Sequence, residues 1–378
     1  MPVVSLSPLH AAEGFTVDAL LRGLGATLLR PALSWTFPVL AVLRNSSART
    51  VPAALDALRT ADYPHLAKAD PAFQLALAVF AAGVALAANA QLNRVVRNNL
   101  ARDHKGWDWA REIVAITGGA GGLGSEVARR LSAKGIRVVV LDVAPLAADA
   151  PAAGIAYYKV DLSNAQGVKD VALRVQQEVG HPTVLINMAG VVRAASILDM
   201  TQRDVDLTYD INVKAHYYTT QAFLPRMIEE GHGHVITIAS STAYHQAATG
   251  VAYCSSKAAA LSFHEGLTEE LRHLYARSGR AVRTSVIAPA HFKTRMFAGF
   301  ESLIPAFFAP SLEVATVAGL VERTVLSGES QHIIEPHYAK CTPLGRALPT
   351  WLYATILFFA KDAMGGVREY KAREGKSE

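Results

Sequence analysis

Three features of the sequence predict an α/β fold built on a doubly wound, Rossmann-type parallel sheet. The first is a short apolar run, 113–117, that leads directly into a glycine-rich segment, 118–124. The second is a helical stretch at about 125–134, followed by another apolar run at 136–141. The third is the recurrence of short apolar runs farther along the chain, at 155–160, 235–240 and 332–336. Because strands that alternate with helices usually form a parallel sheet, these features predict βαβ units.

The glycine-rich segment is typical of a dinucleotide-binding turn. Glycines let the backbone approach the pyrophosphate, which lies at the N-terminus of the following helix. The alternative is a glycine-rich loop without a ligand, but strand, glycines and helix agree here. In this segment we expect the cofactor to be contacted by Thr117, Gly118, Gly122, Leu123 and Gly124.

Asp142 ends the second strand, eighteen residues after Gly124. An acid at this place accepts hydrogen bonds from the adenosine ribose hydroxyls. The same carboxylate repels a 2′-phosphate, so the sequence predicts NAD(H) as the cofactor and leaves NADP(H) as the second choice.

Tyr253 and Lys257 lie four residues apart on a predicted helix and therefore share one face. An unperturbed tyrosine has a pKa of about 10 and is a poor base at neutral pH. Lowering that pKa by about three units takes roughly 4 kcal/mol, which a lysine ammonium and a cationic nicotinamide can supply together. With a serine hydroxyl to bind the substrate oxygen, this pair suits proton transfer to or from an alcohol or carbonyl.

Two adjacent serines, Ser240 and Ser241, end the run at 235–240. Neighbours on a strand point to opposite faces, so we expect only one of them to reach the substrate. Ser240 lies thirteen residues before Tyr253, and Ser241 lies twelve residues before it.

Further motifs follow in order along the chain. Asp161-Leu162 ends the third strand, Asn187-Met-Ala-Gly190 ends a fourth, and Asn212 stands in Asp-Ile-Asn-Val. Taken with the glycine turn and the Tyr253–Lys257 pair, they resemble the ordered motifs of the short-chain dehydrogenase/reductase family. The resemblance covers about 112–336.

The resemblance implies roles for individual residues. Two positions depart from the family pattern: Met188 replaces an asparagine, and Ala290 replaces a glycine. The further cofactor contacts that the resemblance implies are Asp161, Leu162, Asn187, Ala189, Gly190, Tyr253, Lys257, Pro289 and Thr294.

The same resemblance implies a catalytic tetrad of Asn212, Ser240, Tyr253 and Lys257. The family's spacing of thirteen residues to the tyrosine selects Ser240 over Ser241. Tyr253 would take the hydroxyl proton while hydride passes to the cofactor, and Lys257 would lower the pKa of Tyr253 and hold the nicotinamide ribose. Asn212 would anchor a water in a proton relay to solvent.

The residues around the tetrad are similar to those of one membrane-associated subgroup, which comprises 17β-hydroxysteroid dehydrogenase type 11 and retinol dehydrogenase 10. This likeness implies a lipophilic alcohol or ketone as substrate. An apolar stretch after Pro289 fits a pocket for such a substrate, although ordinary core packing explains it nearly as well. Its members are Met296, Phe297, Phe300, Leu303, Ile304, Phe307 and Phe308.

Composition favours a membrane partner over nucleic acid. The 378 residues carry a net charge of +5, are 51% hydrophobic and have a mean hydropathy of +0.20. No basic–aromatic cluster or nucleic-acid motif is present, so an anionic membrane surface is the better match for the basic excess. Only two cysteines occur, Cys254 and Cys341, which fits a cytosol-facing domain without disulfides, and no metal-ligand spacing is present.

The first part of the chain, 1–105, is expected to be a helical, membrane-associating region. Its segment 72–90 contains no charged residue and, as a helix, would be about 28 Å long, close to the hydrocarbon thickness. A buried helix that packs on the enzyme domain is the alternative. The basic residues that follow the segment would hold the catalytic domain, 106–340, on the cytosolic side of the endoplasmic reticulum or of a lipid droplet. These residues are Arg94, Arg97, Arg102, Lys105 and Arg111.

The last part of the chain, 341–378, contains a second apolar run at 351–360, which is too short to span a membrane. It is expected to be an interfacial helix, a lid over the substrate pocket, or both. The charged tail, 368–378, is expected to be mobile.

These observations predict a membrane-associated, NAD(H)-dependent oxidoreductase for a lipophilic alcohol, ketone or aldehyde. Two alternatives remain: a soluble ketoreductase of a secondary-metabolite pathway, and a non-catalytic NAD-binding membrane scaffold. The family resemblance also implies a homodimer, paired through the helices that follow the fourth and fifth strands.

Overall fold

The computed structural model describes residues 13–44, 46, 50–100, 106–146, 154–300, 304–359 and 364–374. Contacts divide the described residues into two compact units. One unit runs from 17 to 96, and the other begins at 97 and also includes residues 13–16.

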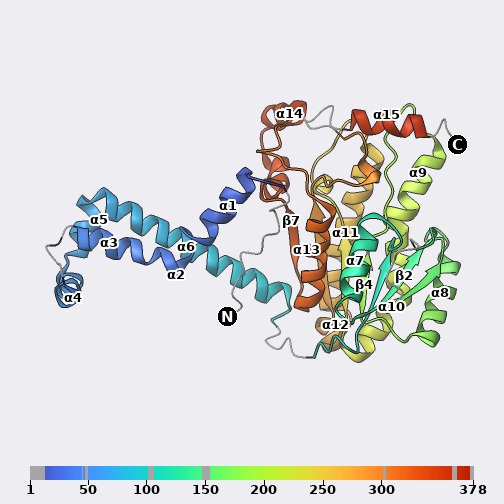
Figure 1. The fold of residues 1–378 in the computed structure, drawn as a ribbon, viewed down its shortest axis with the longest axis horizontal. Helices are drawn as coiled ribbons and strands as arrows, with labels where there is room; N and C mark the ends of the chain where they lie inside the picture. The colour runs from blue at the N-terminus through green and yellow to red at the C-terminus, as the bar shows by residue number, and fades with distance from the viewer. Residues whose placement is uncertain are drawn as a thin grey trace. The chain divides into compact units, whose positions relative to one another are not determined.

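A seven-stranded, all-parallel sheet forms the centre of the larger unit (Figure 1). The strand order is β3-β2-β1-β4-β5-β6-β7, so the direction of winding reverses between β1 and β4. The predicted fold class is confirmed, and every predicted strand is present; β6 is one that the sequence reading did not single out. The strands are β1 (Ile113–Thr117), β2 (Arg137–Asp142), β3 (Ile155–Lys159), β4 (Val184–Asn187), β5 (His234–Ile238), β6 (Arg283–Pro289) and β7 (His332–Glu335).

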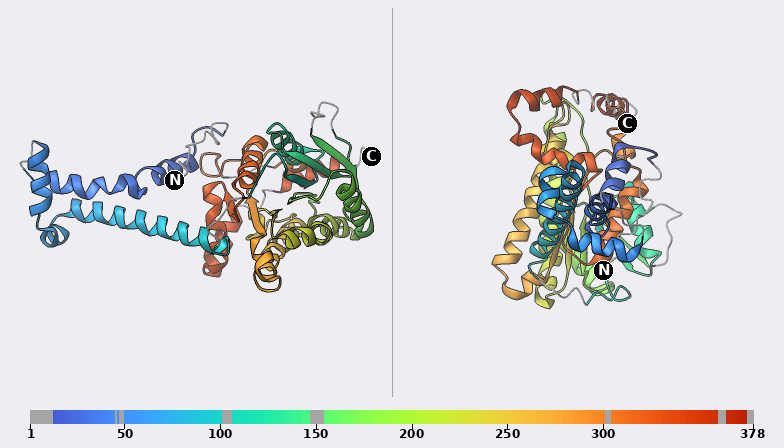
Figure 2. Two further views of the ribbon diagram at one scale, coloured as in Figure 1. Left: turned by 90° about the horizontal axis from the view of Figure 1, so that it is seen from below. Right: turned by 90° about the vertical axis from the view of Figure 1, so that its left-hand side faces the viewer.

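Helices cover both faces of the sheet (Figure 2). Alternate residues of β1 point to opposite faces: Ile113 belongs to one apolar core and Val114 to the other. The first core is closed by α8 (Ala165–Glu178), α10 (Ala215–Glu230) and α11 (Val251–His273), and the second by α7 (Gly122–Ser132) and α13 (Val314–Ser327). Burial on both faces explains why the strands are continuous apolar runs.

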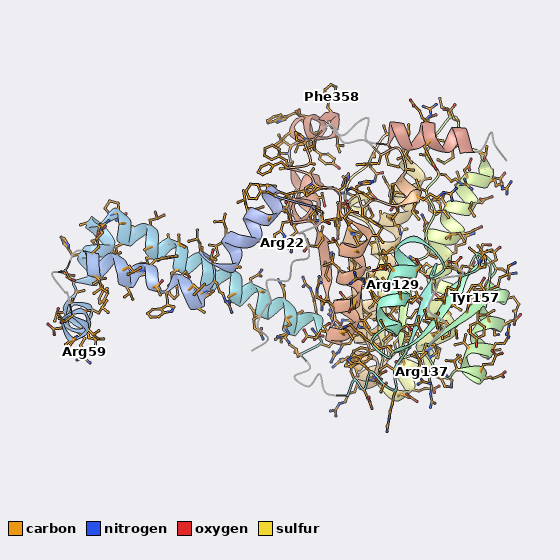
Figure 3. The ribbon with its side chains drawn as sticks, viewed as in Figure 1. Arg22, Arg59, Arg129, Arg137, Tyr157 and Phe358 are labelled. Atoms are coloured by element: carbon orange, nitrogen blue, oxygen red, sulfur yellow. The ribbon has the colours of Figure 1, made fainter. Side chains whose placement is uncertain are left out.

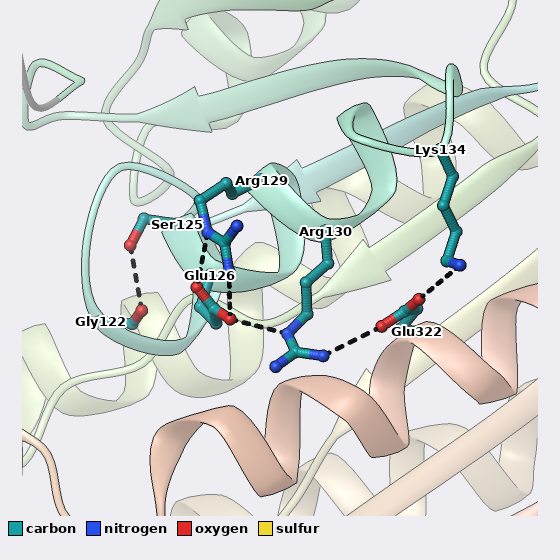
Figure 4. Close-up of polar contacts among 7 residues, drawn as sticks. All are labelled: Gly122, Ser125, Glu126, Arg129, Arg130, Lys134 and Glu322. Carbon is teal, nitrogen blue, oxygen red and sulfur yellow. Dashed lines mark hydrogen bonds and ion pairs between the residues drawn. The ribbon is translucent and has the colours of Figure 1, made fainter. Parts of the chain in front are cut away.

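Ion pairs join α7 to α13 at the surface (Figure 4). Glu322 accepts from Arg130 at 3.3 Å and from Lys134 at 3.2 Å, while Arg130 also reaches Glu126 at 2.7 Å. Ion pairs near the surface, such as these partly buried ones, contribute little to stability, about 1 kcal/mol or less each. The apolar contact between the two helices therefore determines their position.

The smaller unit contains six helices within its described residues. They are α1 (Val17–Ala26), α2 (Pro31–Ser34), α3 (Thr36–Arg44), α4 (Val51–Thr60), α5 (Tyr63–Ala69) and α6 (Pro71–Arg97). The predicted segment 72–90 lies inside α6, which has 27 residues and is apolar and long enough to cross a membrane, with 11% of its most apolar window buried. The pair formed by α1 and residues 31–44, bent by 61°, passes the same test as one broken span.

The C-terminal part of the chain belongs to the larger unit. It comprises η4 (His337–Ala347), α14 (Thr350–Phe359) and α15 (Gly365–Glu374). The apolar run at 351–360 is helical through Phe359, and Phe358 on α14 points away from the sheet (Figure 3). The tail differs from the expectation, because residues 368–374 are helical and Arg368 pairs with Asp199.

Candidate active site

A cleft of about 560 Å³ lies at the carboxyl ends of the strands, where the winding of the sheet reverses. Parallel α/β sheets bind their ligands at this place. The cleft gathers most of the predicted cofactor residues: Gly118, Gly122, Leu123, Gly124, Asp142, Asp161, Leu162, Ala189, Gly190, Tyr253, Lys257 and Thr294.

The glycine turn is packed so closely that side chains are excluded. A Cβ on Gly118 would lie 2.8 Å from the Cα of Ala189, and the φ of Gly118 is +68°. A Cβ on Gly124 would lie 2.1 Å from the carbonyl oxygen of Gly118. Gly121, in contrast, borders open space in the cleft. The turn thus leaves room for a dinucleotide against bare backbone.

Two further features of the cleft fit a dinucleotide. The Asp142 carboxylate is held by backbone amides, accepting from Ala120 at 2.9 Å and from Ala144 at 3.0 Å. The Thr294 hydroxyl is buried without a hydrogen-bond partner among the described residues. A buried unpaired hydroxyl in a cleft is suited to a polar ligand group.

Thr117 and Asn187 do not line the cleft, contrary to the expectation for cofactor-binding residues. The Thr117 hydroxyl accepts from the amides of Met188 and Ala189, at 2.9 and 3.1 Å. The Asn187 amide is bound by two threonines of α10, Thr219 and Thr220. The Thr117 side chain thus holds the start of the loop after β4, and the Asn187 side chain joins the end of β4 to α10.

A second cavity, of about 180 Å³, adjoins the cleft. It is lined mainly by apolar side chains, including Phe297, Phe300 and Ile304 from the predicted apolar stretch; Leu303 lies outside the described residues. Pro289 lines this cavity and not the cleft. The walls that the two hollows share are Ala239, Tyr253, Phe292 and Phe297.

Tyr253 is therefore the polar side chain that faces both hollows. Burial raises the pKa of Tyr253 above its ordinary value, a hydrogen bond with Ser240 lowers it, and the neighbouring Cys254 raises it slightly. In the protein alone the pKa of Tyr253 is therefore raised, because desolvation of the phenol outweighs the hydrogen bond with Ser240.

Lys257 is buried on the same face of α11. Its ammonium donates to the carbonyl of Ile238 at 2.9 Å and lies 5.9 Å from the centre of the Tyr253 ring. Burial lowers the pKa of Lys257 to about 8. The nitrogen faces Gly190, whose missing Cβ would lie 3.5 Å from it, so the ammonium borders the cleft.

Asn212 lies in a short π-helical turn, Asp210–Lys214, a form that is frequent at functional sites. Its side chain accepts from the amide of Val191 at 2.8 Å and donates to the Val191 carbonyl at 3.0 Å and to Ser256 at 2.9 Å. The side chain is thus fully engaged and ties α11 to the loop after β4.

Ser240 and Ser241 both line the second cavity, contrary to the expectation that only one reaches it. The alternation argument fails because β5 ends at Ile238, before the two serines. Ser240 nevertheless differs from its neighbour: Thr242 donates to its hydroxyl at 2.9 Å, and Tyr253 shares a hydrogen bond with it.

The family model for short chain dehydrogenases matches residues 112–302 of this sequence. The chain belongs to the short-chain dehydrogenase family. Among its relatives, dehydrogenase RED2 of Cochliobolus heterostrophus is 37% identical over 56% of this chain and 78% of the relative. Estradiol 17-beta-dehydrogenase 11 of Mus musculus is 33% identical over 64% of this chain and 80% of the relative. Epidermal retinol dehydrogenase 2 of Homo sapiens is 36% identical over 54% of this chain and 67% of the relative.

Solved structures of short-chain dehydrogenases share the fold. One from Burkholderia cenocepacia, solved with NADP, superposes with a TM-score of 0.55 at 22% identity, over 66% of this chain and 99% of its own. One from Streptomyces avermitilis has a TM-score of 0.53 at 22% identity, over 67% of this chain and 99% of its own. As a short-chain dehydrogenase the chain is an oxidoreductase of a family that binds nicotinamide cofactors.

Further residues outside the tetrad shape this short-chain dehydrogenase site. His291 lines the second cavity, stacks on Phe300 at 3.7 Å, and has its pKa lowered by burial to about 4, so it is neutral at pH 7. Phe297 meets the Tyr253 ring edge-on at 5.6 Å. Met364 reaches the cavity from the C-terminal part of the chain. Residues that approach from distant segments in this way follow no local spacing.

Proposed function

We propose that the protein transfers a hydride between NAD(H) and a lipophilic alcohol or carbonyl compound. The observation that carries this proposal is the position of Tyr253 in the wall between the cleft and the apolar cavity. A substrate oxygen placed at that wall lies within reach of the Tyr253 and Ser240 hydroxyls.

In the oxidative direction, Ser240 orients the substrate hydroxyl and Tyr253 accepts its proton. The nicotinamide, when bound, supplies the hydride acceptor. Lys257, whose ammonium borders the cleft, holds the cofactor ribose and adds positive charge near the phenol. In the reductive direction the phenol of Tyr253, which burial keeps neutral, donates its proton to the carbonyl oxygen.

Asp142 supports NAD(H) as the cofactor. Its carboxylate lines the cleft and is fixed by two backbone amides, so it cannot easily turn away from a ligand. A 2′-phosphate at this place would meet a fixed negative charge.

The apolar lining of the second cavity supports a lipophilic substrate. Phe297, Phe300 and Ile304 place hydrocarbon in the wall of the cavity. Contact with these side chains stabilises the apolar groups of a substrate by removing them from water.

We further propose that the protein is membrane-associated through the region 1–105, with the catalytic domain, 106–340, and the C-terminal segment, 341–378, at the cytosolic face of the endoplasmic reticulum or of a lipid droplet. α6 has the length and composition of a membrane span. On α14, Trp351 and Phe358 are 70% and 60% exposed, which suits contact with a lipid interface. Release of the protein by alkaline carbonate without detergent would contradict an integral span.

A homodimer through α10 and α11 is part of the same proposal. A surface groove of about 780 Å³ runs between these helices and is lined by Tyr217, Leu224, Phe263 and Leu267 among others. Light scattering of the protein in detergent, corrected for the micelle, measures its mass and distinguishes a dimer from a monomer.

Substitution of the tyrosine tests the proposed chemistry. Tyr253→Phe is expected to lower kcat by about 10²- to 10⁴-fold with any substrate, because it removes one proton-transfer group. Its NADH affinity should stay unchanged. Tyr217→Phe, which removes a half-exposed hydroxyl from α10, is the matched control and should retain full activity.

A screen of retinoids, sterols and long-chain alcohols with detergent-purified protein then identifies the substrate. Full turnover by Tyr253→Phe would contradict the mechanism. Tight NADH binding by the unaltered protein without turnover of any compound would favour the non-catalytic scaffold instead.

A further inference from the structure

The start of α15 is buried against Tyr253. Met364, directly before α15, is 6% exposed, and Val367 in its first turn is fully buried. Both side chains belong to one apolar cluster with Tyr253 and Cys254. A segment 111 residues beyond the tyrosine thus supplies part of its surroundings.

A contact between two glycines fixes α15 to the loop after β6. A Cβ on Gly299 would lie 2.3 Å from the carbonyl oxygen of Gly366, and a Cβ on Gly366 would lie 2.0 Å from that of Gly299. Only two residues without side chains allow this approach. The same loop carries Phe297, whose ring meets that of Tyr253.

A second tether joins α15 to the loop after β4. Arg368 donates to Asp199 at 3.2 Å, and the same loop carries Val192 and Ala194 of the apolar cluster. The pair is exposed, so it adds little energy. Its position shows that α15 bridges the loop after β4 and the loop after β6.

We propose that Met364 determines the size of the substrate that this protein accepts. This inference rests on the proposed function. Met364 lines the cavity, and the backbone that carries it is held by the contacts of Gly366, Val367 and Arg368, which act as positioning residues. Methionine is unbranched and flexible, so it limits the cavity while adapting its shape to the ligand.

The volume of the cavity gives the scale of the limit. The cavity measures about 180 Å³, so the length of one side chain in its wall changes a large share of the room for a substrate. Shortening the Met364 side chain should therefore favour bulky substrates, and enlarging it should exclude them.

The test measures ketone binding to the complex of the full-length protein with NADH, by the change in NADH fluorescence in detergent. Every protein in the test also carries Tyr253→Phe, because the slowed reaction leaves the NADH intact during the measurement. The ligands are 2-butanone, 2-octanone and cyclohexyl methyl ketone, and the variants are Met364→Ala, Met364→Trp and Met364→Leu. Relative to 2-butanone, affinity for the two larger ketones is expected to rise about tenfold in Met364→Ala and to fall about tenfold in Met364→Trp, the scale of one or two methylenes in a pocket. Met364→Leu should stay within about threefold of the unaltered protein, because the two side chains have similar volume.

The ratio of the ketone affinities is the readout because general loosening of the fold changes all affinities together. An unchanged ratio in Met364→Ala would overturn the inference, even if Met364→Trp does not fold. Reduction of the same ketones is measured separately. Ketones that bind with the expected size preference but are never reduced would contradict the proposed function and support the role of Met364.

Discussion

The ammonium nitrogen of Lys257 donates a hydrogen bond to the carbonyl oxygen of Ile238 at 2.9 Å and lies 5.9 Å from the centre of the Tyr253 ring. The two side chains share a face of α11, but the lysine is anchored to the end of β5 and not to the phenol. The ammonium is thereby kept at the border of the cleft, where it is ready for a ligand.

Lys257→Met is expected to stabilise the protein while abolishing its activity. Burial lowers the pKa of Lys257 from 10.5 to about 8, which corresponds to about 3 kcal/mol of destabilisation of the charged form. The penalty is fully present below pH 8 and is lost as the pH rises from 8 to 10.5, because in this interval only the unfolded state binds the proton. Loss of the bond to Ile238 offsets part of it, so we expect a gain of about 1–2 kcal/mol at pH 7. Chemical denaturation in detergent measures this, and a lower stability of the variant would contradict it.

Two glycines of the turn should respond differently to alanine. Gly124→Ala is expected to destabilise the protein by about 2 kcal/mol or more, because its Cβ would lie 2.1 Å from the Gly118 carbonyl oxygen. Gly121→Ala meets no protein atom within 4 Å and should leave the melting temperature unchanged. Since Gly121 lines the cleft, its variant should bind NADH about tenfold more weakly. Undiminished NADH affinity in Gly121→Ala would place the pyrophosphate elsewhere.

Asp142→Asn should shift the cofactor preference towards NADPH. We expect the unaltered protein to have the higher kcat/KM with NADH, and the ratio of NADH to NADPH to fall about tenfold in the variant, which corresponds to about 1.4 kcal/mol of charge repulsion. Asp161→Asn is the matched control, since Asp161 lines the same cleft but should not meet the 2′-phosphate. A higher kcat/KM with NADPH than with NADH in the unaltered protein would contradict the assignment of NAD(H) as the cofactor.

The buried histidines should make the protein sensitive to acid. Burial lowers the pKa of His216, His234 and His264 to about 3. These residues therefore stay neutral in the folded state while the unfolded state takes up protons below pH 6.5, so stability is complete above pH 6.5 and is lost as the pH falls. Below pH 6.5 each histidine lowers the free energy of unfolding by up to about 1.4 kcal/mol per pH unit, which amounts to about 2 kcal/mol at pH 5.

His216→Phe isolates one of these contributions. His216 packs near Phe263, and its Nε2 has no hydrogen-bond partner among the described residues, so phenylalanine suits the site. Between pH 6.5 and pH 5 the variant should lose about 2 kcal/mol less of its free energy of unfolding than the unaltered protein. Equal slopes for the two proteins in urea titrations would show that His216 is not neutral in the folded state.

The fold could be predicted from the sequence because its signals are local. Continuous apolar runs follow from the burial of both faces of the sheet, and the turn at Gly118–Gly124 follows from a steric demand that only glycine meets. β6 was missed because its apolar residues are mixed with Arg283, Thr284 and Ser285, which are all buried through contacts to distant segments.

For the site, the sequence by itself determined which residue types stand at the ends of the strands and on α11. The spacing of Tyr253 and Lys257 follows from the helical repeat, and Asp142 follows from the end of a strand. Only the tertiary structure decided what these side chains meet: Ile238 for Lys257, and the start of α15, with Met364, for Tyr253. The physical reason is that periodicity fixes the face of an element, whereas the contacts of a site join segments that only packing brings together.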